Sequence, residues 1–314
     1  MQQQIINYQA PILVTGAHRT GTTWVGKMLA VSPQLAYISE PLNVLHRPGV
    51  MRTPVPHWYT YISSDNEAEY LPAFHELLQF YYHPWAEFRS LHSRKDLLRM
   101  GRDWSIFIRG RWLHQRVLLK DPFAVFSIPW FSQRLGCLVI ITIRHPAAFA
   151  SSLVRLGWSF DFSNLLEQPL LMRDYLEPYR AEMEKMTASL QDIIGQASLL
   201  WKIVYAVVSQ LKYSQIQYQI VRHEDFSRNP VECYRNLYIT QGLNFTSQVE
   251  KKILNTSNSE NPKELSRNKV HTVHLDSQAN LSNWKHRLTP EEIQRVRELT
   301  AGVADEYYSD QDWD

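Results

Sequence analysis

The chain has 314 residues, of which 44% are hydrophobic and 12% aromatic, so it can form the core of one large domain and is not a disordered chain. Its 33 basic and 31 acidic residues give a net charge of +2, which argues against a nucleic-acid-binding protein but allows a local basic pocket. Cys137 and Cys233, the only cysteines, exclude a disulfide framework or zinc cluster and indicate core thiols in a reducing compartment.

The amino-terminal stretch MQQQIINYQAPILVTG lacks the basic segment and the apolar segment of a signal peptide. No run of the sequence reaches the roughly 18 consecutive apolar residues that a membrane span requires. We therefore expect a cytoplasmic protein without a membrane span.

Short apolar segments alternate with helical segments along most of the chain. This alternation predicts an α/β fold, in which helices flank a parallel sheet and ligands bind at the carboxyl ends of the strands. The predicted strands are 11–16, 35–39, 116–121, 137–143 and 218–222, and the predicted helices are 22–31, 145–156 and 174–213. Thr289, Pro290 and Glu292 form the expected start of a terminal helix.

Residues 45–115 interrupt this alternation with a proline-rich loop and a partly helical, aromatic stretch, FHELLQFYYHPWAEF. We interpret residues 1–314 as a single domain with an aromatic-rich cap inserted at about 45–115 on the substrate side. The rings of Trp58, Tyr59, Tyr61 and Trp85 are candidates to stack on a bound sugar or phenol; the alternative is that they form the core of the cap.

The loop after the first predicted strand has the spacing of a phosphate-binding loop. Gly16 and Gly21 allow a tight turn that directs backbone N–H groups at an anion, and a helix amino terminus follows. Thr22 and Thr23 add hydroxyl groups, and Arg19 adds a guanidinium group. The lysine that nucleoside triphosphatases carry after the second glycine is absent, so the loop suits a different phosphate-bearing ligand.

A second candidate anion site follows the strongest predicted strand. Arg144 lies at the carboxyl end of that strand, and Ser152 lies eight residues later in the next helix. Both belong at the same edge of the sheet as the first loop. An arginine and a serine hydroxyl suit a second, separate phosphate, whereas the alternative is a salt bridge at a strand end and a packed serine.

Together these two segments resemble the sulfotransferase family, whose donor is 3′-phosphoadenosine-5′-phosphosulfate (PAPS). RTGTTW (19–24) matches the family's 5′-phosphosulfate loop, and RHPAAFASS (144–152) matches its 3′-phosphate element. The resemblance implies a P-loop-like fold without a metal ion, and it extends over nearly the whole chain except the 45–115 insertion. The donor-binding residues that it implies are His18, Arg19, Thr20, Gly21, Thr22, Thr23, Trp24, Arg144, Ser152 and His223.

The resemblance also implies the reaction, transfer of a sulfuryl group from PAPS to an acceptor hydroxyl. Arg19 is the first candidate for the cation at the leaving group, and Lys120 is a weaker one. Pro122 stands where some relatives have a catalytic histidine, so Glu40, in the context SEPLN, is favoured as the base over Asp121. Failing both, His46, His57 and His83 are candidates in the insertion.

Other features leave alternatives open. The family's late Arg-Lys-Gly loop has no clear equivalent, and Lys285 and Arg287 match it only loosely. The glutamate and the aromatic insertion favour a carbohydrate or glycoconjugate acceptor over another small molecule. An ATP-dependent small-molecule kinase with a P-loop fold is the alternative enzyme, and a nucleotide-binding regulatory module without turnover is a third class.

Overall fold

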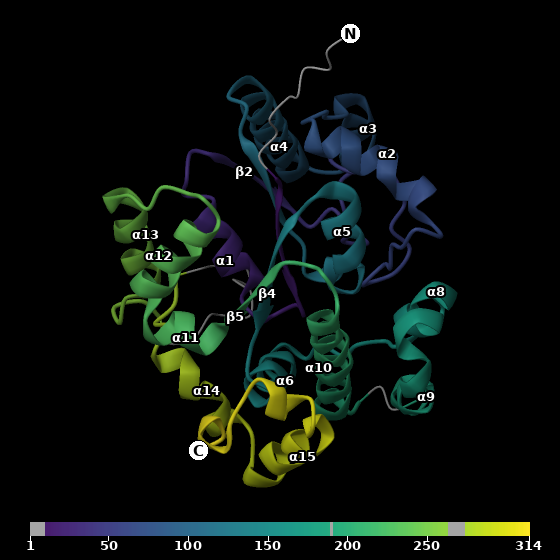
Figure 1. The fold of residues 1–314 in the computed structure, drawn as a ribbon, viewed down its shortest axis with the longest axis vertical. Helices are drawn as coiled ribbons and strands as arrows, with labels where there is room; N and C mark the ends of the chain where they lie inside the picture. Colours follow the sequence, from purple (N-terminus) through teal and green to yellow (C-terminus); the bar gives the residue numbers. More distant parts are fainter. Residues whose placement is uncertain (1–9, 189–190, 263–273) are drawn as a thin grey trace.

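The computed structural model describes residues 10–188, 191–262 and 274–314. Five strands form one parallel sheet in the order β2-β3-β1-β4-β5 (Figure 1). They are β1 (Ile12–Gly16), β2 (Leu35–Ser39), β3 (Arg116–Lys120), β4 (Leu138–Ile143) and β5 (Tyr218–Arg222). The predicted α/β class and parallel sheet flanked by helices are confirmed, and each predicted strand is present to within one residue at either end.

Helices cover both faces of the sheet, because successive residues of each buried strand point to opposite sides. Leu13 and Ile141 belong to the larger apolar cluster, which includes α5, α6, α10 and the insertion. Val14 and Ile140 belong to a second cluster with α1, α12 and α13. In Figure 1 these two groups of helices lie on opposite sides of the strands. The central strands therefore have no solvated face.

The helices of the described residues have the following bounds. They are α1 (Thr22–Leu29), α2 (Glu67–Leu78), α3 (Pro84–Arg89), α4 (Arg94–Trp112), α5 (Ile128–Leu135), α6 (Pro146–Leu156), α7 (Ser163–Leu166), α8 (Pro169–Leu171), α9 (Arg180–Thr187), α10 (Ile193–Gln210), α11 (His223–Arg228), α12 (Pro230–Thr240), α13 (Ser247–Ser257), α14 (Ala279–Arg287) and α15 (Pro290–Thr300). Short helical turns are η1 (Pro122–Ser127), η2 (Met172–Leu176), η3 (Glu177–Tyr179), η4 (Leu211–Tyr213), η5 (Ala304–Glu306) and η6 (Asp310–Asp312).

The prediction of one helical stretch over 174–213 is wrong. The segment contains the end of η2, then η3, α9, α10 and η4, and residues 189–190 within it lie outside the described residues. The side chain of Asp192 accepts a hydrogen bond from the Gly195 N–H at 2.9 Å and caps α10. The apolar pattern continued through this segment, but Asp192 starts a new helix.

The predicted terminal helix is confirmed at α15. The Thr289 hydroxyl accepts from the Glu292 N–H at 3.2 Å, and the Glu292 carboxylate accepts from the Thr289 N–H at 2.8 Å, which completes the expected capping box. Pro290 occupies the first helical turn, where its missing N–H costs no hydrogen bond.

Among the described residues, one helical segment, Ile193–Tyr213, is long and apolar enough to cross a membrane by length and composition alone. Most of this segment is buried inside the protein, where α10 packs against α6 and α15. This burial is the pattern of the central helix of a folded core.

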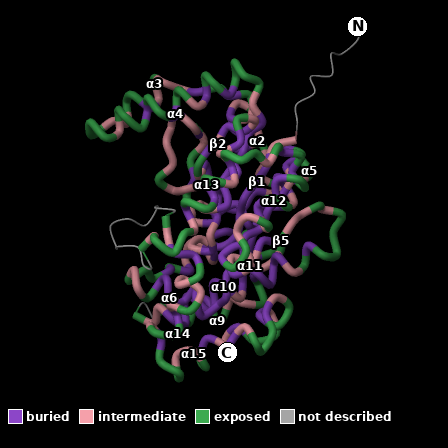
Figure 2. Tube along the Cα trace, turned by 90° about the vertical axis from the view of Figure 1, so that its left-hand side faces the viewer, coloured by how far each residue is buried: buried purple, intermediate pink, exposed green. Residues whose placement is uncertain are grey.

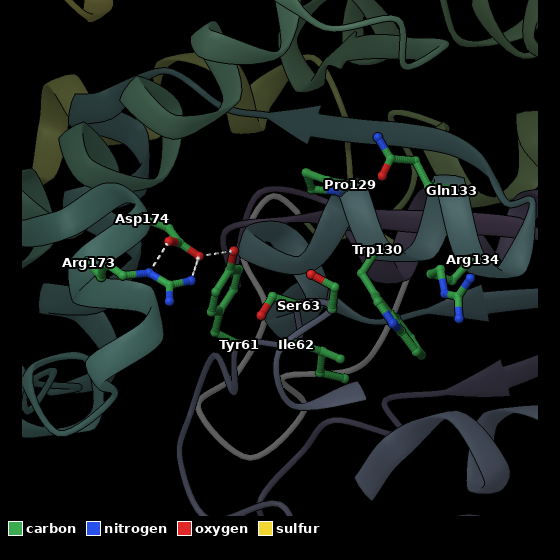
Figure 3. A pocket seen from close by; sticks show the side chains of 10 residues that line it. Tyr61, Ile62, Ser63, Pro129, Trp130, Gln133, Arg134, Arg173 and Asp174 are labelled. Carbon is green, nitrogen blue, oxygen red and sulfur yellow. Dashed lines mark hydrogen bonds and ion pairs between the residues drawn. The ribbon is translucent and has the colours of Figure 1, made fainter. Parts of the chain in front are cut away.

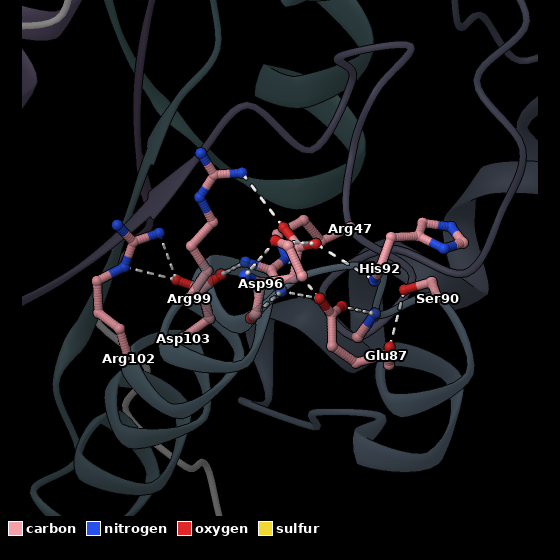
Figure 4. A network of polar contacts seen from close by, with 10 residues as sticks. Arg47, Glu87, Ser90, His92, Asp96, Arg99, Arg102 and Asp103 are labelled. Carbon is pink, nitrogen blue, oxygen red and sulfur yellow. Dashed lines mark hydrogen bonds and ion pairs between the residues drawn. The ribbon is translucent and has the colours of Figure 1, made fainter.

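The insertion contains α2, α3 and α4, which lie at one end of the molecule (Figure 2). Its side chains Met51, Phe74, Leu77 and Phe107 are buried in the same apolar cluster as one face of the sheet. A polar network attaches α3 and α4 to the loop after β2 (Figure 4). In it, the buried Glu87 carboxylate bonds the Arg47 guanidinium group and the Gly49 N–H.

Candidate active site

The loop between β1 and α1 (residues 16–21) turns tightly because two glycines adopt positive φ angles. Gly16 has φ 138° and Gly21 has φ 102°. A Cβ atom at Gly16 would collide with the Thr142 carbonyl, and one at Gly21 would lie 3.0 Å from His223 Nδ1. Both positions therefore require glycine for two reasons, the backbone angle and the close approach of a neighbour.

The polar side chains of this loop are not equivalent. The Thr20 hydroxyl donates to the Ala17 carbonyl at 2.6 Å and lies 2.7 Å from the Thr142 hydroxyl, so it faces the interior. Any contact of Thr20 with a phosphate must therefore come from its backbone N–H. Thr22 is buried and Thr23 is partly exposed, both in the first turn of α1. Their position at a helix amino terminus is the one predicted for anion binding.

Strand order brings the second predicted loop beside the first. β1 and β4 are paired, with Gly16 opposite Thr142, so the two loops leave the sheet side by side. Ser152, on α6, accepts a hydrogen bond from Arg19 Nε at 3.3 Å. The Arg144 Nη1 group lies 3.5 Å from the Arg19 carbonyl oxygen. Arg19, Arg144 and Ser152, predicted from separate motifs, thus form one cluster.

The cluster is strongly electropositive. Burial, followed by repulsion from Arg144 and Arg155, lowers the pKa of Arg19 to about 10. Burial also lowers the pKa of Arg144 to about 10, where Arg287 and Arg155 oppose its charge and Glu224 favours it. Arg144 Nε is buried without a hydrogen-bond partner among the described residues. Buried cations that repel each other, one with an unused donor, are suited to an anionic ligand.

Trp24 and His223 lie beside the first loop, as predicted. Their rings make an edge-to-face contact with centroids 5.7 Å apart. His223 begins α11 at the end of β5, and burial together with Arg144 and Arg19 lowers its pKa well below the usual value. Asn280 of α14 lies between this ring and the second loop, 3.3 Å from His223 Nε2 and 3.5 Å from Arg144.

Two residues of α10 hold both loops in place. The fully buried Tyr205 hydroxyl donates to the Thr142 carbonyl at 2.8 Å and accepts from the Ala17 N–H at 3.4 Å. Trp201 Nε1 donates to the Arg144 carbonyl at 2.8 Å. The Tyr205 hydroxyl therefore joins the ends of β1 and β4. Neither residue could be predicted from the sequence, because both lie in an apolar helix with no motif.

Glu40 and Lys120 meet at the ends of β2 and β3. The Lys120 ammonium group forms an ion pair with Glu40 Oε1, and Asn43 donates to Glu40 Oε2 at 2.8 Å. Lys120 is almost fully buried, whereas the Glu40 side chain is 22% exposed. The Glu40 carboxylate is thus held by a cation and an amide but remains reachable from outside.

Asp121 has a different environment. Its residue is fully buried, and its two carboxylate oxygens accept from the backbone N–H groups of Leu42 at 2.6 Å and Phe123 at 3.0 Å. Burial is the main cause that raises the pKa of this carboxyl to about 7. Asp121 caps the turn η1 and anchors the segment after Glu40.

Three of the five non-glycine residues with positive φ among the described residues lie in this region: Arg19 (67°), Glu40 (54°) and Tyr59 (62°). Such angles cost energy in residues with a Cβ atom and often occur at functional sites. Arg19 and Glu40 both follow the carboxyl ends of parallel strands, so they lie at the same edge of the sheet.

The aromatic residues of the insertion take different positions from those expected for ligand stacking. Tyr59 is fully buried, and its hydroxyl lies 2.7 Å from His18 Nδ1 and accepts from the His18 N–H at 3.2 Å. Tyr61 is buried as well, and Trp58 packs on Phe123. Tyr59 is therefore enclosed in the core and is not placed to stack on a ligand, whereas Tyr61 also lines the pocket described below.

The His18 ring lies between Tyr59 of the insertion and Phe149 of α6. Burial, followed by repulsion from Arg19, lowers its pKa to about 4, while Glu40 acts in the opposite direction. The ring is therefore neutral at pH 7 and contacts the insertion through Tyr59.

The three candidate histidines of the insertion each lie beside a polar partner, and only that of His83 belongs to the insertion. His46 Nδ1 lies 2.9 Å from the Asn43 carbonyl, and His83 Nε2 lies 2.9 Å from Glu76. His57 Nδ1 lies 4.0 Å from Glu167.

The two late basic residues differ. Lys285 bonds the Asp314 carbonyl, whereas Arg287 acts electrostatically on Arg144. Residues 263–273, which precede α14, lie outside the described residues.

A pocket of about 230 Å³ lies behind the segment 61–64, against α5 and η2 (Figure 3). Its two arginines already bond carboxylates: Arg173 bonds Asp174, and Arg134 bonds Glu67. None of the residues predicted to bind the donor lines it. Within the described ranges, no group of three or more His, Cys, Asp or Glu side chains is placed to hold a metal ion.

Comparison with known proteins identifies the family. A model described as "Sulfotransferase family" matches residues 11–247, which is more than half of the chain. The protein therefore belongs to the sulfotransferase family, and the resemblance predicted from the two loops is confirmed.

Curated relatives match shorter stretches. Carbohydrate sulfotransferase 5 of Mus musculus is 33% identical over 91 residues, 29% of this chain and 23% of that protein. Carbohydrate sulfotransferase 6 of Homo sapiens is 38% identical over 88 residues, 28% of this chain and 22% of that protein. The chain thus matches under a quarter of the length of these relatives.

Solved structures are similar over nearly the whole chain. A sulfotransferase domain from the Synechococcus PCC 7002 olefin synthase has a TM-score of 0.49 and 18% identity, covering 98% of this chain and 99% of that chain. The mouse sulfotransferase SULT7A1, complexed with PAP, has a TM-score of 0.46 and 14% identity, covering 96% of this chain and 89% of that chain.

Proposed function

We propose that the protein transfers a sulfuryl group from PAPS to an acceptor hydroxyl and releases 3′,5′-ADP. The observation that carries this proposal is the cluster of Arg19, Arg144 and Ser152, in which the two predicted anion loops meet. Membership of the sulfotransferase family supports the same activity.

The donor side suits a ligand with two separate anionic groups. The glycine loop and the amino terminus of α1 suit the 5′-phosphosulfate, and Arg144 with its unused Nε suits the 3′-phosphate. Trp24 and His223 border the space between these elements, where the adenine belongs. Arg155 and Arg287 add positive charge around Arg144.

Two cations are available where negative charge builds up on the leaving phosphate. Arg19 lies between the two loops, with its Nε held by Ser152 at 3.3 Å. Lys120 is the second cation: its side chain packs beside Gly26 of α1, and its ammonium group pairs with Glu40. Fixed cations at this point lower the barrier, because their charge is already oriented before the reaction.

Glu40 is the proposed general base. The acceptor oxygen bonds to sulfur while the proton of the acceptor hydroxyl passes to the Glu40 carboxylate. The bond between sulfur and the bridging oxygen of the donor breaks, which releases 3′,5′-ADP. Glu40 is partly exposed and follows β2 at the edge where the donor loops lie. Asp121 is fully enclosed and uses both oxygens as backbone acceptors, so it is proposed as a structural cap.

A carbohydrate hydroxyl is the proposed acceptor, because the curated relatives that match are carbohydrate sulfotransferases. We also propose a single domain with a substrate-side cap and a reducing, cytoplasmic location. Both cysteines are unpaired, and burial raises the pKa of Cys137 to about 12, which leaves it an unreactive thiol. Cell fractionation tests the location.

Calorimetric titration tests the donor assignment. The protein should bind 3′,5′-ADP more tightly than ADP, by on the order of 1.5–3 kcal/mol for the charge-assisted contacts to the 3′-phosphate. The preference should persist when magnesium is chelated. Equal affinity for the two nucleotides, or binding that requires magnesium, would contradict PAPS use and favour a kinase.

A further inference from the structure

One face of α4 exposes bulky apolar side chains to solvent. Leu97, Trp104, Ile108 and Trp112 are between 44% and 81% exposed. Their spacing of seven, four and four residues places them on one side of the helix. The buried stripe of α4, which includes Met100, Phe107 and Gly110, is different and packs on the protein. α4 thus has a second apolar stripe, which no described residue covers.

Exposed apolar side chains are concentrated around this helix. Of the 16 large hydrophobic side chains that are exposed among the described residues, ten lie between Leu45 and Leu113. In Figure 2, α3 and α4 lie at one end of the molecule, and much of their trace is exposed. Scattered exposed residues need no explanation, but a concentration of this kind marks an interaction surface.

The exposed face of α4 is also positively charged. The helix contains six basic and two acidic residues, a net charge of +4. Both acidic residues belong to the network of Figure 4: Asp96 pairs with Arg99 at 3.6 Å, and Asp103 pairs with Arg47 at 3.5 Å. The acidic side chains are therefore neutralised by neighbouring arginines of this network.

Four basic residues of α4, Arg94, Lys95, Arg109 and Arg111, have no carboxylate at ion-pair distance within the described part of the chain. Leu98, which is 75% exposed, extends the border of this apolar stripe. Arg111 follows Trp104 by seven positions, and Arg109 follows Leu98 by eleven, so these cations lie along the borders of the stripe.

We propose that this face of α4 docks on an anionic membrane surface. Phospholipid offers both chemistries that the face requires, an apolar layer for Trp104, Ile108 and Trp112 and phosphate groups for the bordering cations. If a second copy of the protein covered this face, two α4 helices, each with a net charge of +4, would lie against each other. Their repulsion argues against pairing between identical faces. A hydrophilic polyanion would pair with the cations but leave the apolar stripe in water.

This surface is independent of the proposed chemistry, since none of its residues belongs to the donor cluster. The amino-terminal part of α4 contacts Arg47 in the loop after β2, whereas Trp112 lies four residues before β3, at the opposite end of the strands from Glu40.

Flotation of the whole protein with vesicles tests the proposal. We expect binding to vesicles of phosphatidylcholine and phosphatidylglycerol, much weaker binding to phosphatidylcholine alone, and release at high salt. Arg109→Gln with Arg111→Gln should lower the partition coefficient roughly 30-fold. Leu98→Ser with Trp112→Ser should lower it at least as much, because their apolar contact area is lost.

Matched exposed substitutions on other elements serve as controls. Tyr213→Ser with Ile239→Ser removes similar apolar area, and Lys251→Gln with Lys252→Gln removes the same charge, so both should bind vesicles as the unmodified protein does. Absence of binding to anionic vesicles, or equal losses in the controls, would overturn the proposal. A dimer in solution that the Leu98→Ser, Trp112→Ser variant separates would also overturn it, since a second copy would then cover the face.

Discussion

The donor side and the acceptor side of the candidate site reach their positions in different ways. On the donor side, Arg19 and Arg144 belong to short segments that follow adjacent parallel strands, so strand pairing alone brings them together. On the acceptor side, Glu40 is held by its ion pair with Lys120. The segment after Glu40 is anchored by the hydrogen bond from the Leu42 N–H to Asp121, and these two residues are 79 positions apart in the chain. Local motifs therefore define the donor side, and long-range packing defines the acceptor side.

The largest expected effect is on the acceptor side. Glu40→Gln keeps the size of the side chain and removes the charge that accepts the proton, so turnover should fall by about 10²–10⁴-fold. Binding of 3′,5′-ADP should not change, because Glu40 lies outside the donor cluster. Single-turnover transfer to a sugar acceptor and calorimetry measure the two quantities.

Asp121→Asn is the matched control for this prediction. It should slow transfer less than Glu40→Gln, and its main effect should be lower stability, since one of the two carboxylate oxygens that accept from backbone N–H groups is replaced by an amide donor. The reverse result would make Asp121 the base. If neither substitution slows transfer, the base belongs to the insertion, where His46, His57 and His83 are the candidates.

The next effect concerns the donor side. Arg144→Ala should weaken 3′,5′-ADP binding by on the order of 1.5–3 kcal/mol and leave ADP binding nearly unchanged. Arg155→Ala, one helical turn beyond Ser152, removes the same charge from the edge of the cluster and should have a smaller effect. Equal losses for the two nucleotides would show that Arg144 contributes only general positive charge.

These differences explain how much the sequence could predict. The five strands, Arg19, Arg144 and Ser152 follow from apolar patterns and from motifs at strand ends, because parallel strands end at the same edge of a sheet. The bridging role of Tyr205 and the contact of Tyr59 with His18 span 63 and 41 residues of sequence, and no local pattern encodes them. The start of α10 after Asp192 could not be predicted, because the apolar pattern continues across that position.

Tyr205→Phe tests whether α10 holds the two donor loops together. Loss of the hydroxyl leaves the buried Thr142 carbonyl without its donor, so the free energy of unfolding should fall by about 1–3 kcal/mol. Tyr234→Phe is the control, because the buried Tyr234 hydroxyl has no hydrogen-bond partner among the described residues. That variant should be as stable as the original protein. Equal losses of stability would mean that the bridge contributes nothing specific.

The smallest expected effect is on the pH dependence of stability, and it concerns His145, the residue next to Arg144. His145 is enclosed by Trp284, Tyr308 and Trp313, and neither ring nitrogen has a hydrogen-bond partner in the described part of the chain. Burial lowers its pKa to about 3. Between the ordinary pKa of about 6.5 and this value the unfolded chain binds more protons, so stability is lost as the pH falls through that range.

His145→Phe should remove this loss, because phenylalanine fits an aromatic cage and carries no proton. The slope of the unfolding free energy against pH between about 6.5 and 3 should decrease by at most about 1.4 kcal/mol per pH unit. His18 and His223, whose pKa values are also lowered by burial, should keep part of the slope. Urea unfolding over this pH range measures it, with exposed His75→Phe as the control. An unchanged slope would mean that His145 becomes protonated inside the folded protein, and the aromatic cage beside the donor site would then open in acid.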